Sequence, residues 1–383
     1  MELHMNKPIY LDYNATTPHA PEVIEAMRPY LEEHFGNPSS SHWYGSEPRR
    51  AVEKARQQVA GLLGCAPEEV VFTSGGTEAN NHAIKGTAWA LRDRGTHIIT
   101  SAVEHPAVLE VCRALAGFGF ATTVLPVDGE GLVDPAAVEE AVRPGTILIT
   151  IMHANNEVGA IQPLAEIAAI ARRYNVIFHT DAAQSVGKIP AAVDALGVDL
   201  LSVAGHKLYA PKGIGALYIR SSVKPARFCH GAGQERGRRA GTENVTQIVG
   251  LGKACELASL NMEQHAAEMR RLRDRLAAGL TGVLPDSRVN GHPVHRLPNT
   301  LSMSFKGVEA DRLIERIGGE VAVSPGAACH SGAVSISHVL SAMGIPEEWA
   351  KGTVRFSVGR MTTLAEVDRA AKVVAAAVRE LRA

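Results

Sequence analysis

An acidic and a basic residue each stand directly after a short apolar stretch of this chain. Asp181 ends the stretch VIFHTD (176–181), and Lys207 ends the GHK that follows DLLSVA (199–204). A buried carboxylate needs a cationic or proton-bearing partner, because burying it charged and unpaired is costly. A lysine at such a place loses solvation and becomes a nucleophile that can form a Schiff base with an aldehyde, whereas Lys212 is expected to be an ordinary surface lysine. We therefore predict that Asp181 and Lys207 share one chemical site.

One cysteine, Cys329, lies in a stretch that is otherwise rich in small residues, SPGAACHSGAV (324–334). A reactive thiol needs exposure and a flexible or electropositive setting, which this stretch could supply, although small-residue loops also serve simply to turn the chain. The cysteines are widely spaced and contain no C-x-x-C pair, so they predict neither a disulfide framework nor a zinc ribbon. They are Cys65, Cys112, Cys229, Cys255 and Cys329. His292 and His295 lack Cys or carboxylate partners nearby, and we expect a polar loop there and no metal site.

Polar residues also follow three other apolar stretches, and each has an ordinary alternative explanation. Gly76 and Thr77 come at the expected start of a helix, where backbone N–H groups and hydroxyls can bind phosphate or simply cap the helix. His105 could stack on a planar ligand or shuttle protons, or it could be a hydrogen-bonded edge residue. Asn156 belongs to an Asn pair that suits a ligand oxygen or a turn.

Taken together, these residue types describe one cofactor. Pyridoxal 5'-phosphate (PLP) needs a phosphate cup, a ring-stacking side chain, an acid facing its pyridine nitrogen, and a lysine for a Schiff base. Asp181 and Lys207 follow consecutive strands, which would place them side by side in a parallel sheet. The sequence therefore predicts a PLP site.

The elements that must position these residues alternate between short apolar runs and helical patterns from about residue 50 to 250. This alternation predicts an α/β fold with a mostly parallel seven-stranded sheet, helices on both faces, and ligands beyond the carboxyl ends of the strands. Two of the helices are expected over 47–64, with Gly64 as a stop, and over 163–175, with Pro163 at the start. The strands are expected at 69–74, 97–102, 121–127, 147–153, 176–181, 199–205 and 215–220.

After Thr242 the alternation of apolar runs and helical patterns gives way to a long charged helical pattern and a second set of strands, which predicts a smaller α+β domain. We expect a large PLP-binding domain over residues 16–256 and a small domain over 257–383, completed by residues 1–15, that carries Cys329. Its elements are a charged helix over 260–280, strands at 300–305, 321–326 and 353–359, and an amphipathic helix over 364–381.

Composition and charge exclude several classes of partner. The chain has 383 residues, with 39 basic and 40 acidic side chains and a formal net charge of -1. Bulk charge therefore gives no reason to expect binding to nucleic acid or to a membrane surface. No run of about eighteen apolar residues occurs, so we expect a cytoplasmic protein.

Ten motifs of the chain resemble those of the class V aminotransferase-like enzymes that comprise cysteine desulfurases and selenocysteine lyases. The likeness runs from about residue 8 to 365, and the motifs are long and in order. They are YLDYNATTP, GNPSSSHWYG, FTSGGTEANN, EHPAV, HANNEVG, HTDAAQSVGK, GHKLYAPKGIGALY, GQERGRRAGTEN, GAACHS and RFSVGR. The resemblance implies a fold-type I PLP-dependent homodimer.

The resemblance also implies a role for each site residue. Lys207 would carry the cofactor, and Cys329 would accept sulfur from the substrate. Arg355 would clamp the substrate carboxylate, a bidentate task that suits guanidinium. The remaining cofactor contacts would be Asp181 on the pyridine nitrogen, His105 on the ring, Gln184 and Asn156 near the ring oxygen, and Gly76, Thr77, His206 and the other subunit's Thr242 on the phosphate.

Two positions depart from the family pattern. Ala204 stands where many desulfurases have a serine that binds the phosphate, which predicts a slightly weaker phosphate grip. Pro106 stands where selenium-specific members tend to carry Asp, although ANNE, GQERGRRAGTEN and GAACHS look more like the selenocysteine lyase branch. The choice between L-cysteine and L-selenocysteine is therefore open.

The expected reaction is that of a cysteine desulfurase, which turns L-cysteine into L-alanine and leaves a persulfide on Cys329. That sulfur would pass to an acceptor protein, such as an iron-sulfur scaffold or a thiolation protein, and His330 is a conceivable influence on the thiol. The alternatives are a selenocysteine lyase, another PLP-dependent reaction on the same scaffold, and a cofactor-free binding protein.

Overall fold

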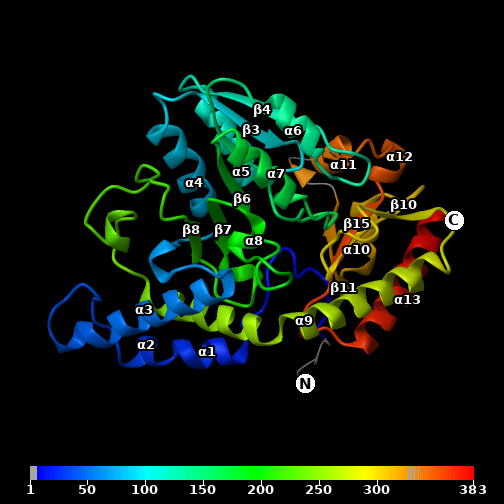
Figure 1. The fold of residues 1–383 in the computed structure, drawn as a ribbon. Coiled ribbons are helices and arrows are strands. Elements are labelled where there is room, and N and C mark those ends of the chain that lie inside the picture. Colours follow the sequence, from blue (N-terminus) through cyan, green and yellow to red (C-terminus); the bar gives the residue numbers. More distant parts are fainter. Residues whose placement is uncertain (1–6, 327–328, 331–332, 335) are drawn as a thin grey trace.

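The computed structural model describes residues 7–326, 329–330, 333–334 and 336–383. Its larger part is built on a seven-stranded sheet, which fills the left and centre of Figure 1. All seven expected strands are present, with ends that differ from the expected ones by up to three residues. In spatial order they are β2 (Val70–Thr73), β8 (Gly215–Ile219), β7 (Leu200–Ala204), β6 (Ile177–Asp181), β5 (Thr146–Thr150), β3 (His97–Ser101) and β4 (Ala121–Leu125).

The sheet is mostly parallel, as predicted. Only β8 runs against its neighbours, pairing antiparallel with both β2 and β7. The inner strands β3, β5, β7 and β8 are buried over their full length because helices cover both faces, and this explains their continuous apolar runs. β4, at one edge, leaves Val124 exposed. The site residues that follow β6 and β7 are therefore carried by neighbouring parallel strands.

Helices cover the two faces of the sheet in separate groups. One face packs against α4 (Gly76–Ala90) and α5 (Pro106–Ala116). The other packs against α3 (Trp43–Leu63), α6 (Pro135–Ala141), α7 (Leu164–Arg173) and part of α9 (Val245–Thr281). Short helical segments complete this part, and they are α1 (Pro21–Met27), α2 (Pro29–Glu32), α8 (Val193–Leu196), η1 (Pro67–Glu69), η2 (Gly205–Lys207) and η3 (Glu235–Gly237).

The two helices expected from sequence signals are present. α3 ends where expected, because Gly64 adopts a left-handed conformation with φ 65° that glycine tolerates best, but it begins earlier than expected, at Trp43. Pro163 caps the start of α7. The local stop and start signals at Gly64 and Pro163 therefore predicted two of these four helix ends.

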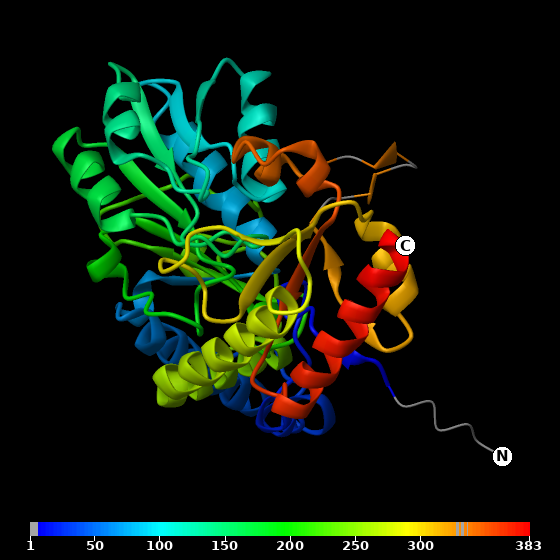
Figure 2. The ribbon, with the colours of Figure 1, turned by 90° about the vertical axis from the view of Figure 1, so that its right-hand side faces the viewer.

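The smaller part lies at the right of Figure 1 and is an α+β layer around a four-stranded sheet. That sheet has the order β12 (Ser324–Pro325), β15 (Thr353–Ser357), β10 (Thr300–Phe305) and β9 (Ser287–Asn290). Two-stranded pairs join β1 (Ile9–Tyr10) to β11 (Val321–Ala322) and β13 (Cys329–His330) to β14 (Ala333–Val334). Its helices are α10 (Ala310–Ile317), α11 (His338–Ala342), α12 (Glu347–Ala350) and α13 (Leu364–Arg382). Figures 1 and 2 show α13, in red, at the end of the molecule away from α4.

Helix α9 connects the two parts and is longer than the expected helix over 260–280. Its backbone bends at Asn261, where φ is −134° and ψ is 21°. Before the bend, Leu251 belongs to the core under the large sheet, and after it, Leu272 belongs to the core of the smaller part, which also contains Leu11. The division at residues 256 and 257 stays a prediction, and these two cores support a boundary close to it.

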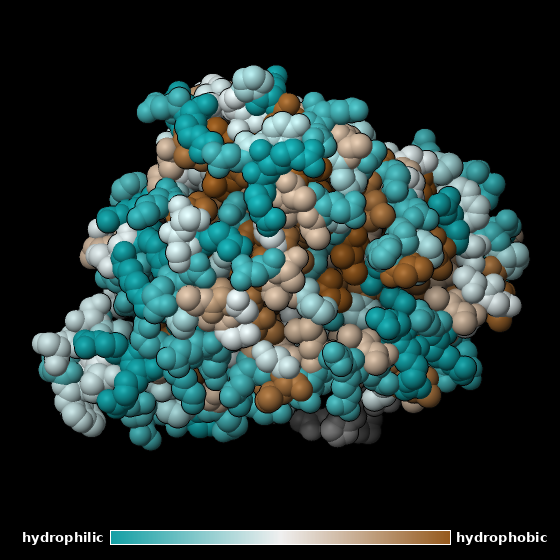
Figure 3. All heavy atoms as spheres, in the orientation of Figure 1, coloured by the Kyte–Doolittle hydropathy of each residue, from teal (hydrophilic) through white to brown (hydrophobic). Residues whose placement is uncertain are grey.

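Polar residues cover most of the face seen in Figure 3, and hydrophobic residues gather near its middle. Across the helices that the structure describes, none is both long and apolar enough to cross a membrane.

Candidate active site

A cavity of about 270 Å³ opens at the carboxyl ends of the parallel strands. Asp181 ends β6, and Lys207 follows the neighbouring strand β7 on the short segment η2. Nine of the predicted site residues line this one cavity, which makes it the candidate active site. They are Gly76, Thr77, His105, Asn156, Asp181, Gln184, His206, Lys207 and Arg355.

Lys207 is the nucleophile candidate, and its surroundings favour the neutral amine. The pKa of Lys207 is lowered to about 8, chiefly by desolvation and then by the nearby positive charge of Arg355, while Asp12 and Asp181 oppose the shift. Its Nζ donates to the backbone oxygen of Asn14 and, at 3.0 Å, to that of Ala15. A fraction of the amine is therefore unprotonated near neutral pH, as Schiff-base formation requires.

Asp181 is buried at the bottom of the cavity, where hydrogen bonds fix its orientation. Its Oδ2 accepts from Asn80 Nδ2 at 2.7 Å, and its Oδ1 accepts from the backbone N–H of Ala183 at 2.9 Å. Asn80 lies on α4 and is almost fully buried. An oriented carboxylate of this kind can hold a proton on a ring nitrogen at one defined place.

His105 stands at the mouth of the cavity, directly before α5. Its Nδ1 accepts a hydrogen bond from the backbone N–H of Ala107 at 3.1 Å, which caps the helix and fixes the ring. Desolvation lowers the pKa of His105, and Lys207 adds to that against the opposing effect of Asp181. A neutral, fixed imidazole of this kind suits stacking on a planar ligand. Pro106, the departure from the family pattern, supplies the first helical position, where a missing N–H costs nothing.

Glu104, next to His105, forms hydrogen bonds to residues at the ends of both β3 and β5. Its Oε1 accepts from Ser101 Oγ at 2.7 Å and from the backbone N–H of Met152 at 2.8 Å. Complete burial raises the pKa of Glu104 to about 8. We infer that this carboxyl stays largely protonated at neutral pH and helps to hold the turn that carries His105.

The phosphate cup predicted at Gly76 and Thr77 is present as the first turn of α4. Backbone N–H groups in the first turn of a helix have no carbonyl acceptor within the helix, which suits them to bind an anion. A Cβ on Gly76 would come within 3.1 Å of the Ala204 Cβ, so only glycine leaves this space open. His206 completes the cup, and burial lowers its pKa to about 4, which keeps the ring neutral.

Arg355 reaches the cavity from the smaller part of the molecule. It lies on β15, and its guanidinium donates to Asp12 Oδ1 at 2.9 Å and to the backbone oxygen of Asn156 at 3.1 Å. Its Nε is buried and has no hydrogen-bond partner among the described residues. The guanidinium is thus oriented from two sides and keeps a donor for a carboxylate.

Two predicted residues are not placed in the cavity. Thr242 is exposed and borders a separate hollow beside Ser74, so its role as a residue offered to another subunit stays a prediction. Cys329 is described only by its backbone in β13, and the side chains of Cys329 and His330 lie outside the described residues. The segment leading to Cys329 starts beside the site, because Ser324 of β12 pairs with Arg355. Five residues can span at most about 18 Å, so the Cα of Cys329 lies no farther than that from the Cα of Ser324.

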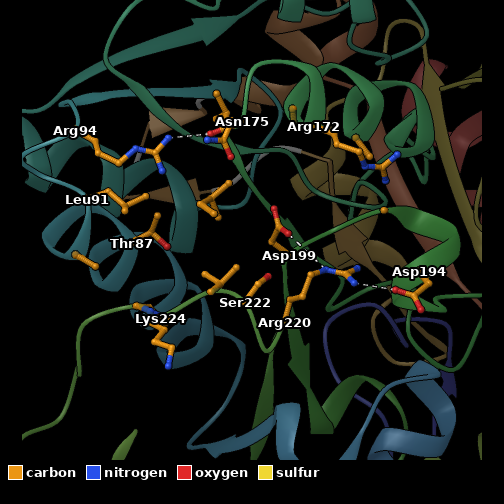
Figure 4. A pocket seen from close by; sticks show the side chains of 18 residues that line it. Thr87, Leu91, Arg94, Arg172, Asn175, Asp194, Asp199, Arg220, Ser222 and Lys224 are labelled. Carbon is orange, nitrogen blue, oxygen red and sulfur yellow. Dashed lines mark hydrogen bonds and ion pairs between the residues drawn. The ribbon is translucent and has the colours of Figure 1, made fainter.

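A second cavity, of about 500 Å³, lies at the other end of the parallel strands, next to the starts of β6 and β7 (Figure 4). Its polar side chains largely satisfy one another, because Arg220 pairs with Asp194 at 3.0 Å and Arg94 donates to the backbone oxygen of Asn175. None of the predicted site residues lines it. The larger volume therefore does not mark the chemical centre.

Comparison with known proteins agrees with this geometry. The model of the aminotransferase class-V family matches residues 9–370. The chain is 50% identical over 379 residues to a cysteine desulfurase IscS of Dictyoglomus turgidum, covering 99% of this chain and 96% of the relative. It is 47% identical over 365 residues to the human cysteine desulfurase, covering 94% of this chain and 80% of that one. The chain belongs to the cysteine desulfurase family.

Solved structures show the same desulfurase-family fold. A NifS-like protein superposes with a TM-score of 0.91 at 39% identity, covering 96% of this chain and 98% of that one. A structure described as SspA in complex with cysteine superposes with a TM-score of 0.81 at 37% identity, covering 93% of this chain and all of that one. The family thus confirms the mostly parallel α/β fold expected from the sequence.

Sequence reasoning missed three residues of this desulfurase-family site, namely Asp12, Asn14 and Asn80. Asn80 had a usable signal, since it lies one helical turn after Gly76 and therefore on the same side of α4. Asp12 and Asn14 lie in the motif YLDYNATTP, but nothing local shows that this segment enters the cavity.

Proposed function

We propose that the protein is a PLP-dependent cysteine desulfurase that converts L-cysteine to L-alanine and collects the sulfur as a persulfide on Cys329. The observation that carries this proposal is the convergence of Lys207, Asp181 and Arg355 on one cavity. An amine with a lowered pKa, an oriented carboxylate and an oriented guanidinium match an aldehyde, a ring nitrogen and a substrate carboxylate.

The residues present fit PLP. The first turn of α4 offers free N–H groups, and Gly76 leaves open the space that a Cβ would occupy against Ala204. When bound, PLP would supply an electron sink that makes the Cα proton and the sulfur of the substrate labile. Lys207 would hold the cofactor, with Asp181, His105 and Gln184 around its ring and Gly76, Thr77 and His206 around its phosphate.

The chain's own residues would then do three jobs. Arg355 would hold the substrate carboxylate, and the amine of Lys207 would move the proton at Cα. The thiolate of Cys329 would attack the substrate sulfur, so that the carbon–sulfur bond breaks as a sulfur–sulfur bond forms. L-Cysteine and a thiol thereby give L-alanine and a persulfide, with no external oxidant or reductant.

We propose that the protein works as a homodimer. Three exposed aromatic rings form a cluster around Tyr44, whose ring centroid lies 5.6 Å from that of Phe35 and 5.1 Å from that of Trp43. The exposed fraction is 80% for Phe35, 76% for Trp43 and 55% for Tyr44. A cluster of exposed aromatic rings is a frequent feature of protein interfaces. A second copy of the chain covering this cluster would also account for the exposed Thr242, which we expect to complete the partner's phosphate cup.

Turnover tests the proposal. PLP-loaded protein given L-cysteine and a thiol reductant should release alanine and sulfide in equal amounts. Cys329→Ala should abolish sulfide release while the visible absorption of bound PLP remains. Cys229→Ala is the matched control, because Cys229 is a half-buried free cysteine, and it should leave turnover unchanged. Sulfide release that survives Cys329→Ala would refute the persulfide route.

The same assay separates the alternative substrates. Relatives named as cysteine desulfurases favour L-cysteine, and negligible turnover of L-cysteine beside rapid turnover of L-selenocysteine would make the protein a selenocysteine lyase. For the next step, we propose a sulfur-acceptor protein such as an iron-sulfur scaffold, to be tested by transfer of labelled sulfur. A cytoplasmic location stays a prediction.

A further inference from the structure

A second lysine, Lys188, is buried beside the cavity without a carboxylate partner among the described residues. Only 5% of its surface is exposed, and its Nζ makes one hydrogen bond, to Gln184 Oε1 at 3.0 Å. The pKa of Lys188 is lowered to about 7, chiefly by desolvation and then by the positive charges of Lys207 and Arg355. An amine buried in this way is costly, and a leucine or methionine would fill the same space more cheaply. Its presence suggests a task.

The local backbone brings Lys188 to Gln184. The chain turns tightly after β6, where the N–H of Ser185 bonds to Ala182 O at 3.1 Å and the N–H of Lys188 bonds to Ser185 O at 2.9 Å. The turn includes Gly187, whose φ of 78° is left-handed, and it brings Lys188 Nζ to within 3.0 Å of Gln184 Oε1. Gln184 lines the cavity, whereas Lys188 does not. The Gln184 amide therefore lies between the cavity and the Lys188 amine.

An amide has a donor end and an acceptor end, and Lys188 and the backbone oxygen of Asn14 together determine which end points back. Lys188 Nζ donates to Gln184 Oε1, and the protonated form of this lysine can do nothing else. The Nε2 then points the other way and donates to Asn14 O at 3.0 Å, an oxygen that also accepts from Lys207 Nζ. A ligand oxygen that approaches Gln184 meets an N–H group and not a carbonyl.

We propose that Lys188 is a positioning residue that fixes the Gln184 amide, so that the cavity presents an N–H donor to the ring oxygen of PLP. This inference rests on the proposed function. A donor at that oxygen would stabilise negative charge on it and so would lower the pH at which the bound cofactor titrates. The other charged groups that act on Lys207 are Arg355, Asp12 and Asp181, and all of them stay in place when Lys188 is replaced.

The test follows the visible absorption of the PLP-loaded protein as a function of pH. Lys188→Met removes the donor but keeps the volume, so the amide can turn over and the midpoint of the spectral transition should rise by about one pH unit, the effect of losing one hydrogen bond to a charged form. Gln184→Leu should raise it similarly, and the double variant should match Gln184→Leu alone. Lys224→Met, an exposed lysine beside the second cavity, is the control and should not move it.

Two results would overturn the inference. The first is an unchanged midpoint in Lys188→Met. The second is a midpoint in the double variant that lies above that of Gln184→Leu by the full shift seen for Lys188→Met alone, since the lysine would then act by its charge and not through the amide. Thermal denaturation of the cofactor-free variants establishes that they are folded. If the parent protein itself shows no PLP absorption, the proposed function fails, whereas a parent that titrates beside an unaffected Lys188→Met refutes only this inference.

Discussion

At the scale of single residues, the site is built by controlling charge. Burial lowers the pKa of Lys207 and of His206 and raises that of Glu104, so each group is moved toward its neutral form. At neutral pH Glu104 and His206 are then largely neutral and part of Lys207 is, which leaves Arg355 and Asp181 to meet a substrate carboxylate and a ring nitrogen. The chemistry expected of the site depends on this separation.

The lowered pKa of Lys207 predicts how cofactor loading depends on pH. Only the neutral amine attacks an aldehyde, so the rate of PLP attachment to cofactor-free protein should rise with pH and level off above about 8. An ordinary lysine would keep gaining up to about 10.4. Stopped-flow absorbance measures this rate. A rate that still climbs between pH 9 and 10 would contradict the lowered pKa.

Ala204 predicts an effect on cofactor affinity. Its side chain is buried and lines the cavity beside Gly76. Ala204→Ser would add a hydroxyl beside the phosphate cup, and one hydrogen bond to a charged group of about 1.5 kcal/mol should tighten PLP binding about tenfold. Gly76→Ala should weaken binding, because its methyl would crowd Ala204. Equilibrium titration with PLP measures both, and an Ala204→Ser protein that binds no more tightly would refute the phosphate role.

At the scale of elements, a buried ion pair holds the loop between β8 and α9 in place. Arg56 of α3 makes two hydrogen bonds to Glu235, at 2.8 and 2.9 Å, and Glu235 also accepts from the backbone N–H of Phe72 in β2. Glu235 and Arg236 both adopt left-handed backbone conformations, with φ 49° and 55°. Such strain persists only where surrounding contacts enforce it. The pair therefore fixes the loop that carries Thr242.

Breaking this pair should be costly. Glu235→Ala leaves the buried Arg56 with only Glu53, at 3.2 Å, as a charged partner, and we expect a loss of about 3 kcal/mol in the free energy of unfolding, measured by urea denaturation. Glu110→Ala is the control, because its pairing with Arg113 is exposed and should contribute less than about 1 kcal/mol. Equal effects of the two substitutions would show that the buried pair does not anchor the loop.

At the scale of the whole molecule, the site lies where the two parts of the chain meet. Asp12 and Arg355 are separated by 343 positions and bond at 2.9 Å, and Asn14 bonds to Thr300 Oγ1 at 2.8 Å and to the backbone oxygen of Asn156 at 3.1 Å. The N-terminal segment thereby links the smaller part to the loop after β5. Arg355 and the segment of Cys329 are held by the smaller part, while Lys207 belongs to the larger one.

The proposed dimer gives a prediction at this scale. Phe35→Asp combined with Tyr44→Asp puts two charges into the exposed aromatic cluster, so light scattering should report a monomer. PLP affinity should fall as well, because Thr242 of a partner would be lost from the phosphate cup. Phe118→Asp, at an exposed ring elsewhere, is the control. A doubly substituted protein that stays dimeric would place the interface elsewhere.

The sequence was sufficient for the features that repeat locally. Alternating apolar runs and helical patterns predicted the seven strands, because strands buried on both faces must be apolar throughout. Polar residues at strand ends then pointed to Asp181, Lys207, Gly76 and His105, since parallel strands bring their carboxyl ends to one edge. The start of α3 and the length of α9 were not predicted, because tertiary packing determines both.

The sequence by itself thus determined the α/β architecture, the edge of the sheet that carries the chemistry, and the amine and carboxylate that lie side by side there. Only the tertiary structure decided that Asn14 enters the cavity, that Asp12 orients Arg355, that Asn80 orients Asp181, and that Lys188 stands behind Gln184. The physical reason is that local patterns record which face of an element is buried, while a contact across the fold depends on how whole elements pack. No periodicity in the chain records that packing.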